Sequence, residues 1–369
     1  MRAIICGGGT GGHVYPAIAI SEVIESAYKD SEVYFVGRLG GKENAAYENT
    51  KKELFLLDVS GISRSLSVKN ISAIIKAIRA RAYSKKILKK IKPDIVIGTG
   101  GYVCWPMLSA AIELKIPTLL HESNAYPGMV TRMLAQKCTA VMLNYEAALS
   151  YLPKLDNAII TGTPIRSGFD LYTRESARKL LGVKDDEIMI LSFGGSLGSS
   201  CINDKVIEMM EEFSKHSKNI RHFHASGRNH YEEIKQKHPS LVKGELGCKI
   251  LPFIDDMPLY MRACDIAITR SGAITLCELA SAQIASILIP SPNVSENHQF
   301  KNAKTLADMG AAILIEEDAL TSDRLIKEVK ELINNKQLLN RLKRRIAKTA
   351  NNNSPTLIET AINTALDTV

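Results

Sequence analysis

The chain has 369 residues, of which 45% are hydrophobic and 23% charged, so we expect a folded protein of two domains, each with its own core. It contains no apolar run long enough to span a membrane, no signal-peptide pattern and no Cys-x-x-Cys pair among its seven cysteines, which favours a cytosolic protein without a disulfide framework or a zinc site. The net charge of +8 is local, because the segment Gly61–Lys92 carries ten Lys and Arg residues and no acid.

Strands and helices alternate along the first half, as expected for a parallel sheet with helical crossovers. The predicted strands are Arg2–Cys6, Val33–Val36, Asp94–Gly98, Pro117–His121, Ala140–Leu143 and Ala158–Thr161, and the clearest helices are Ile71–Lys90 and Cys104–Leu114. The periodicity then lapses into Gly, Thr, Pro and Ser, so Thr161–Thr173 is predicted to be an interdomain linker.

The same alternation begins again after the linker. Strands are expected at Ile188–Phe193, Ile220–Ala225, Lys249–Pro252, Ile266–Thr269, Ser286–Ile289 and Ala312–Ile315. Each half opens with a strand, a glycine-rich turn and a helix: "GGGTGGH" follows the first strand and "GGSLGSS" follows Phe193. Glycines in such turns allow backbone N–H groups to approach a ligand closely. Two doubly wound domains with ligand sites at the carboxyl ends of their strands are therefore predicted.

Two features suggest other classes of site. Gly7, Gly9 and Gly12 have the spacing of a dinucleotide-binding turn, but the second strand ends in Gly37 and Arg38 where a nicotinamide enzyme normally has an acid. Arginine is compatible with a 2′-phosphate, yet nothing nearby suggests a hydride-transfer site. His222 and His224 alternate along one strand, but without a third ligand nearby in sequence we favour two histidines on one strand face over a metal site.

Eight motifs then occur in order along the chain: "GGTGGHVYPAIAI", "GTGGYVCWPMLSAA", "HESN", "GTPIR", "FGGSLG", "FIDDM", "TRSGAITLCELA" and "NHQFKNA". Their order and spacing resemble glycosyltransferase family 28, specifically the bacterial cell-wall enzymes that add N-acetylglucosamine to undecaprenyl-diphospho-N-acetylmuramoyl-pentapeptide. The resemblance extends from Met1 to about Glu316. It implies a GT-B fold of two Rossmann-like α/β domains facing across a cleft, with inverting chemistry, no metal and no cofactor.

The resemblance also implies a division of labour between the domains. Residues 1–163 are expected to form the acceptor and membrane-binding domain, to which a C-terminal helix at about 350–369 returns. Residues 164–349 are expected to bind the donor, UDP-N-acetylglucosamine. The acceptor is expected to be the undecaprenyl-linked muramoyl-pentapeptide. Another GT-B sugar-nucleotide enzyme, such as a diacylglycerol glycosyltransferase or a UDP-N-acetylglucosamine 2-epimerase, is the alternative.

The donor site needs groups that neutralise a diphosphate, and amides of the second glycine turn together with an arginine suit this role. From the resemblance, Ser196 and Arg166 contact the donor, the Ile254 main chain meets the uracil, Glu278 holds the ribose hydroxyls, and Gln299 contacts the sugar. The remaining expected donor contacts are Ala273, Ile274, Thr275, Leu276 and Cys277. Glu278 as a buried ion-pair partner is the alternative. Asp255 is expected to cap the helix that follows it, and either Ser271 or the turn backbone is expected to cap the helix that carries Glu278.

The first glycine turn remains for the acceptor. Thr10, Gly11 and Gly12 are expected to bind its diphosphate or to close on the donor sugar, and Asn124 is expected to contact a sugar. His13, at the start of a helix, is the candidate general base for the acceptor C4 hydroxyl, and Glu122 is the rival. The alternative to a catalytic His13 is a histidine that merely caps or packs.

Three residues depart from the family pattern, namely Leu197, Thr163 and His298, and each leaves local donor contacts open.

The basic segment Gly61–Lys92 combines isoleucines at helical spacing with flanking Lys and Arg residues. Such a helix suits an anionic membrane surface, and an enzyme with a polyprenyl substrate has to work at the cytoplasmic face of the membrane as a peripheral protein. Isoleucines that pack inward beneath a solvated basic face are the alternative. A nucleic-acid partner is not expected, because Tyr83 is the segment's only aromatic residue for base stacking.

Overall fold

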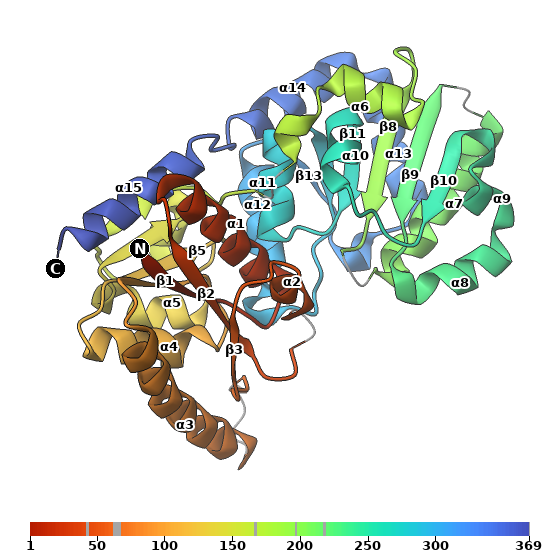
Figure 1. Cartoon of the computed structure of the whole chain (residues 1–369). Coiled ribbons are helices and arrows are strands. Elements are labelled where there is room, and N and C mark those ends of the chain that lie inside the picture. The colour runs from red at the N-terminus through yellow and green to blue at the C-terminus, as the bar shows by residue number, and fades with distance from the viewer. Residues whose placement is uncertain (42–43, 62–67, 166–167, 196–197, 217–218, 369) are drawn as a thin grey trace. The chain divides into compact units, whose positions relative to one another are not determined.

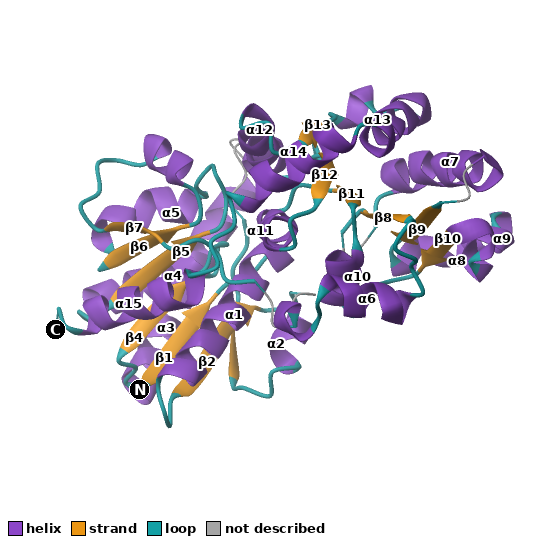
Figure 2. Ribbon diagram, turned by 90° about the horizontal axis from the view of Figure 1, so that it is seen from above, coloured by secondary structure: helices purple, strands orange, loops and turns teal. Residues whose placement is uncertain are grey.

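A computed structural model describes the chain except for residues 42–43, 62–67, 166–167, 196–197, 217–218 and 369. It divides into two compact units, one comprising Met1–Arg166 with Asn351–Val369 and the other Ser167–Ala350 (Figure 1). Each unit is built on one parallel sheet with helices on its faces (Figure 2). The doubly wound α/β fold class predicted from the sequence is therefore confirmed.

In the described part of the first unit, the sheet has seven strands in the order β3-β2-β1-β4-β5-β6-β7. The strands are β1 (Arg2–Cys6), β2 (Glu32–Arg38), β3 (Leu54–Leu57), β4 (Ile95–Gly98), β5 (Thr118–Glu122), β6 (Ala140–Leu143) and β7 (Ala158–Ile160). The helices are α1 (Gly11–Ala27), α2 (Asn44–Glu48), α3 (Val68–Ile91), α4 (Cys104–Glu113), α5 (Met129–Leu134) and α15 (Ser354–Leu366), with 3-10 turns η1 (Ala135–Lys137) and η2 (Glu146–Tyr151).

Side chains of β1 point alternately to the two faces of this sheet and are buried on both. Ile4 and Cys6 belong to the core beneath α3 and α4, whereas Ala3 and Ile5 belong to the core beneath α1 and α15. Successive side chains of a strand point to opposite faces, so one buried strand supplies two hydrophobic layers. The C-terminal helix α15 packs against α1, with Ile358 in the same core.

Among the described residues, the second unit has a six-stranded sheet in the order β10-β9-β8-β11-β12-β13. The strands are β8 (Ile188–Phe193), β9 (Ile220–Ala225), β10 (Cys248–Leu251), β11 (Ile266–Thr269), β12 (Ala285–Leu288) and β13 (Ile313–Leu314). The helices are α6 (Arg174–Leu181), α7 (Ser200–His216), α8 (Arg228–Lys237), α9 (Pro239–Lys243), α10 (Met257–Ala263), α11 (Ala273–Ser281), α12 (His298–Asp308), α13 (Ser322–Asn334) and α14 (Lys336–Ala347). Short 3-10 turns are η3 (Phe169–Leu171), η4 (Glu245–Gly247), η5 (Ser295–Asn297) and η6 (Glu317–Ala319).

The predicted strands are present, with ends that differ by at most two residues, and the long helices at α3 and α4 are confirmed. Strand β3 and helix α2 were not predicted. Because all strands within each sheet run parallel, the loops after their carboxyl ends gather along one edge of that sheet. Most of the predicted site residues lie in or just after these loops.

No helix in the part of the chain that the structure describes is both long and apolar enough to cross a bilayer.

Candidate active site

Two glycine loops interlock at the carboxyl edge of the first sheet, one after β1 and one after β4. The Gly8 amide donates to the Gly100 carbonyl over 3.3 Å. A Cβ atom at Gly101 would lie 2.0 Å from the Gly8 carbonyl oxygen, and one at Gly7 would lie 2.2 Å from Oγ1 of Thr99. Because real Cβ atoms do not approach this closely, glycine is required for the two loops to fit together.

His13 lies in the first turn of α1 and is held by these loops. Its Nδ1 is 2.9 Å from the Gly8 carbonyl oxygen and 3.4 Å from Oγ1 of Thr10. The Thr99 hydroxyl donates to the His13 carbonyl over 2.7 Å. A carbonyl only accepts, so Nδ1 carries the proton, and the lone pair of the neutral ring is on Nε2.

The imidazole of His13 occupies space that any side chain at position 100 would take. A Cβ atom at Gly100 would be 2.5 Å from Cδ2 of His13, and the φ angle of Gly100 is +112°. The ring orientation is therefore set by the β4 loop as well as by Gly8. This role of Gly100 beside the His13 ring was not recognised in the sequence, although the residue lies in the quoted motif "GTGGYVCWPMLSAA".

Glu122, the last residue of β5, is buried and its carboxylate is fully used in local hydrogen bonds. Oε1 accepts from the backbone amide and the side-chain amide of Asn124, each over 3.0 Å. Oε2 accepts from the Gly128 amide over 2.8 Å and from the Thr131 hydroxyl over 2.7 Å. Four donors leave this carboxylate poorly suited to take a further proton, so we interpret Glu122 as a residue that positions the "HESN" loop.

The other predicted acceptor residues lie near these two. Thr10 and Gly11 are exposed, and Gly12 and Asn124 are partly exposed, at the same sheet edge. Thr10 is the N-cap of α1 without a side-chain cap, so the first helical amides have no hydroxyl partner from the cap residue. This arrangement is suited to an anion at the helix N-terminus.

His121, next to Glu122, is fully buried. Its Nε2 donates to the Gly162 carbonyl over 3.1 Å, and Oγ1 of Thr163 lies 3.4 Å from the same nitrogen. Burial lowers the pKa of His121, so it is a neutral structural residue near neutral pH. Thr163, one of the three departures from the family pattern, thus contributes to packing within the first unit.

In the second unit, the glycine turn after β8 is shaped by its surroundings. A Cβ atom at Gly194 would lie 2.6 Å from the Ser199 nitrogen, and one at Gly198 would lie 2.1 Å from the Ser226 carbonyl oxygen. Gly195, with φ of +93°, has open space on the side where a Cβ would be. Ser196 and the departure Leu197 lie outside the described residues, as does Arg166, so their predicted donor contacts remain predictions.

Arg270, which follows β11, holds three loops of this edge together. Its guanidinium donates to the Ser199 hydroxyl over 2.7 Å and to the carbonyls of Ile289 and Pro290 over 3.2 Å each. It also forms an ion pair with Glu317. Sequence reasoning missed this role, although a charged residue directly after a buried parallel strand was a signal that could have found it.

The remaining predicted donor residues follow strands of this same sheet. Ile254 is 3% exposed in the loop after β10, so only its main chain suits a ligand contact. Glu278 is 1% exposed on α11. Oε1 of Gln299, at the start of α12, accepts from the Ser291 amide over 2.9 Å. His298 precedes Gln299 and is partly exposed.

The segment 273–278 forms the first part of α11. Ala273, Ile274 and Leu276 are buried, and Thr275 and Cys277 are partly exposed.

The helix cap predicted at Asp255 is wrong, and of the two alternatives predicted for α11 the side chain of Ser271 is wrong. Asp256, not Asp255, is the N-cap of α10 and accepts from the Leu259 amide over 3.2 Å. Asp255 is instead exposed, 3.7 Å from Arg228. Ser271 does not cap α11, whose N-cap is Gly272, because its hydroxyl donates to the Gln299 carbonyl over 2.8 Å.

His222 and His224 are fully buried on β9. They lie on the face of the sheet that also carries Ser192 of the neighbouring strand β8. The Ser192 hydroxyl lies 2.8 Å from Nε2 of His222 and 2.8 Å from Nδ1 of His224. Nε2 of His224 is 3.1 Å from Oδ1 of Asn203. Burial lowers the pKa of both rings, that of His224 to about 4. The prediction of two histidines on one strand face is confirmed, and among the described residues no group of three His, Cys, Asp or Glu could hold a metal ion.

Helix α3 carries the basic segment. Its isoleucines Ile87 and Ile91 are buried in the core, but the four nearer its start do not pack inward. Ile71, Ile74, Ile75 and Ile78 are 45–60% exposed. Two of the cations are paired with Glu113, namely Arg81 and Lys85. The alternative of a solvated basic face above buried isoleucines is therefore wrong, and a large apolar face is open to solvent.

Both units match domains of one known protein family. Residues 3–143 match the glycosyltransferase family 28 N-terminal domain, and residues 189–360 match the family 28 C-terminal domain. A UDP-N-acetylglucosamine--N-acetylmuramyl-(pentapeptide) pyrophosphoryl-undecaprenol N-acetylglucosamine transferase from Thermoanaerobacter sp. is 39% identical over 344 residues, which is 93% of this chain and 94% of the relative. A Bacillus pumilus protein of the same name is 36% identical over 346 residues, 93% of each chain.

Solved structures with a similar fold include a member of the same family. The crystal structure of Acinetobacter baumannii MurG has a TM-score of 0.76 and 27% identity, and the match covers 97% of this chain and 98% of that chain. A UDP-GlcNAc 2-epimerase from Neisseria meningitidis, bound to UDP-GlcNAc, has a TM-score of 0.68 at 13% identity and covers 98% of this chain and 100% of that chain, which shows a shared fold alone. With both domain models matched and relatives above one-third identity over nearly the whole length, the chain belongs to glycosyltransferase family 28 and has its GT-B fold.

Proposed function

We propose that this protein transfers N-acetylglucosamine from UDP-N-acetylglucosamine to the C4 hydroxyl of the muramoyl sugar of undecaprenyl-diphospho-N-acetylmuramoyl-pentapeptide, the step from lipid I to lipid II in peptidoglycan synthesis. The observation that carries the proposal is the identity of 36–39% over about 93% of the chain with relatives named for this transfer. Transfer proceeds with inversion and without a metal ion.

On the acceptor side, His13 is the general base. Nδ1–H is held by the Gly8 carbonyl, so Nε2 has the lone pair that accepts the proton of the C4 hydroxyl as the oxygen attacks the anomeric carbon. A single displacement of this kind breaks the bond to UDP on the opposite face of the sugar and inverts the anomeric centre. Glu122 and Asn124 position the neighbouring loop, and Thr10, Gly11 and Gly12 bind the acceptor diphosphate through backbone amides.

On the donor side, amides of the turn at Gly194–Gly195 and the start of α7 stabilise the diphosphate of the leaving UDP. Ser196 and Arg166 add a hydroxyl and a positive charge, as the family resemblance implies. Glu278 binds the ribose hydroxyls, the main chain of Ile254 binds the uracil, and Gln299 binds the sugar. Charge neutralisation by amides, a helix N-terminus and arginine needs no divalent cation.

The protein docks on the cytoplasmic face of the membrane through α3. Its exposed isoleucines are suited to the interface of a bilayer, and Lys86 and Lys89 on the same helix are exposed. Each cation near an anionic surface contributes about 1 kcal/mol of binding free energy. Combined apolar and electrostatic contacts of this type suit a peripheral enzyme whose acceptor stays in the bilayer.

The test is incubation with radiolabelled UDP-N-acetylglucosamine and polyprenyl-linked muramoyl-pentapeptide, with and without EDTA, followed by analysis of the products. We expect a labelled lipid product with inverted anomeric configuration in both conditions. Conversion of the donor without an acceptor would instead indicate an epimerase. Activity that EDTA abolishes and magnesium restores would disprove the metal-free mechanism.

A further inference from the structure

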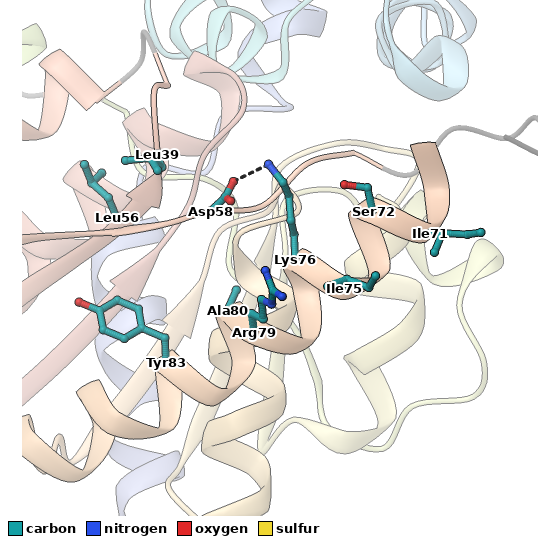
Figure 3. Close-up of a pocket in the computed structure, with 10 residues that line it drawn as sticks. All are labelled: Leu39, Leu56, Asp58, Ile71, Ser72, Ile75, Lys76, Arg79, Ala80 and Tyr83. Carbon is teal, nitrogen blue, oxygen red and sulfur yellow. Dashed lines mark hydrogen bonds and ion pairs between the residues drawn. The ribbon is translucent and has the colours of Figure 1, made fainter. Parts of the chain in front are cut away.

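A groove of about 690 Å³ lies in the first unit between helix α3 and the strands β2 and β3 (Figure 3). Its apolar walls are formed by Leu39, Leu56, Ile71, Ile75 and Tyr83. All five side chains are between 37% and 60% exposed. Apolar side chains gathered in a concave surface and left open to water are typical of a site for an apolar ligand. We call this feature the α3–β3 groove.

Three charged residues also line the α3–β3 groove. Nζ of Lys76 forms an ion pair with Asp58 over 2.9 Å, so these two charges offset each other. The guanidinium of Arg79 has no hydrogen bond or ion pair with the residues that the structure describes. Among the described residues, the groove therefore combines apolar walls with one uncompensated positive charge, which complements an amphiphile with a hydrocarbon chain and an anionic group.

The position of the groove in the sheet ties it to the proposed acceptor site. Leu39 directly follows β2 and Asp58 directly follows β3, so both lie at the carboxyl edge where the glycine loop follows β1. Strands β1, β2 and β3 are neighbours, and adjacent strands are about 4.8 Å apart, which places the end of β3 about 10 Å from that of β1. The chain just beyond β3 also reaches the β4 loop, since a Cβ atom at Gly61 would lie 2.8 Å from the ring of Tyr102.

We propose that the α3–β3 groove binds the polyisoprenoid chain of the acceptor lipid, in the part next to its diphosphate. The proposal rests on the proposed function, because the diphosphate at the first glycine turn brings its own chain to this edge of the sheet. A tethered chain has a high effective concentration at the groove, whereas an acyl chain of a bilayer lipid has no such anchor. The groove thus selects a long isoprenoid acceptor even in the absence of a membrane.

The experiment compares two acceptors that differ only in chain length, a two-isoprene and a four-isoprene diphospho-muramoyl-pentapeptide. Both are used below their micelle-forming concentrations, without detergent or vesicles, at saturating donor. For the wild-type protein we expect a KM for the longer acceptor that is lower by roughly tenfold, which corresponds to about 1.4 kcal/mol. Leu56→Trp fills the groove and should bring the ratio of the two KM values close to one.

Ile160→Trp is the matched control. Ile160 lies on β7, the opposite edge strand, and is 39% exposed compared with 37% for Leu56. This variant should keep the wild-type ratio of KM values. Leu56→Ser makes the same wall polar without adding bulk, and it should also bring the KM values of the two acceptors closer together. The test therefore remains decisive if the tryptophan variant fails to fold.

Each other outcome has a definite meaning. Equal KM values for the two acceptors in the wild-type protein, or an unchanged ratio in the folded Leu56 variants, would overturn the groove proposal while leaving the transfer reaction established. A loss of binding to acceptor-free anionic vesicles in Leu56→Trp, with the ratio unchanged, would assign the groove to bilayer lipid and would also overturn it. Failure of the wild-type protein to glycosylate either acceptor would contradict the proposed function itself.

Discussion

Nδ1 of His13 lies 2.9 Å from the carbonyl oxygen of Gly8, and this contact determines which nitrogen of the ring carries the proton. The loop that contains Gly8 is in turn held by the Gly100 carbonyl. The protonated nitrogen is thus fixed by backbone that only glycine allows.

His13→Ala is therefore expected to lower kcat by roughly 100- to 10,000-fold, the usual contribution of a general base. The KM for UDP-N-acetylglucosamine should change little, because most of the proposed donor contacts belong to the other unit. Steady-state kinetics at saturating acceptor measure both values. His238→Ala, which alters a histidine paired with Glu211 far along the chain, serves as the control. Near-normal turnover of His13→Ala would show that another group takes the proton.

Glu122→Gln is expected to destabilise the protein by about 1–3 kcal/mol, because its amide NH₂ replaces an oxygen that accepts from two donors. Thr131→Val removes only one of the four donors, so its effect on the free energy of unfolding should be smaller. Urea unfolding of both variants measures the difference. A Glu122→Gln protein with wild-type stability and strongly reduced kcat would return Glu122 to the role of general base.

Ile74 and Ile78 are expected to contribute to membrane binding without lining the α3–β3 groove. Changing both to Asp should reduce binding to anionic vesicles at least roughly tenfold, since burial of each isoleucine stabilises by about 1.5–3 kcal/mol. Vesicle sedimentation measures the effect, and added salt should weaken binding of the wild-type protein. Leu180→Asp, at an exposed position of α6, should bind as the wild-type protein does. Equal binding by all three proteins would argue against α3 as the membrane-binding face.

The histidines of β9 predict how stability depends on pH. His224 has a pKa of about 4 in the folded protein and about 6.5 when unfolded, so the unfolded chain takes up a proton first as the pH falls. Above pH 6.5 the ring is neutral in both states and costs nothing, whereas between about pH 6.5 and 4 its preferential protonation in the unfolded chain lowers the free energy of unfolding progressively, by about 3 kcal/mol in all. His222, whose pKa is also lowered by burial, acts in the same direction.

Urea unfolding of the wild-type protein and of His224→Gln between pH 4 and 7 tests this prediction. The glutamine does not titrate, so the stability of the variant should fall less steeply on acidification. His238→Gln, which alters a histidine outside the β9 network, is the control. Parallel curves for wild-type and His224→Gln would mean that His224 does not carry the pH dependence.

Much of the fold was predictable because local patterns are strong in buried parallel strands. The run "RAIIC" before the glycines and "IMILSF" before the second glycine turn are apolar on both faces, and both are strands as predicted. Strand β3, Leu54–Leu57, was missed because four apolar residues between polar neighbours do not distinguish a short edge strand from a buried loop. Without it, the α3–β3 groove could not be expected.

Side-chain roles were harder to predict than elements. Asp255 and Asp256 are adjacent in sequence, and only the backbone geometry decides which of them accepts the Leu259 amide. Arg270 is one charged residue in a motif, and its importance depends on its contacts with three loops that are distant in sequence but follow strands of the same sheet. Such convergence results from parallel strand order, which no local pattern encodes.

The sequence by itself determined the two α/β units, the glycine turns and the family, because periodicity, turn chemistry and ordered motifs are properties of short segments. The tertiary structure alone decided which nitrogen of His13 carries the proton, that Glu122 is saturated by four donors, and that Ile71, Ile74, Ile75 and Ile78 of α3 face solvent. These properties depend on contacts between segments far apart in the chain, where burial and the number of hydrogen-bond partners are set by packing.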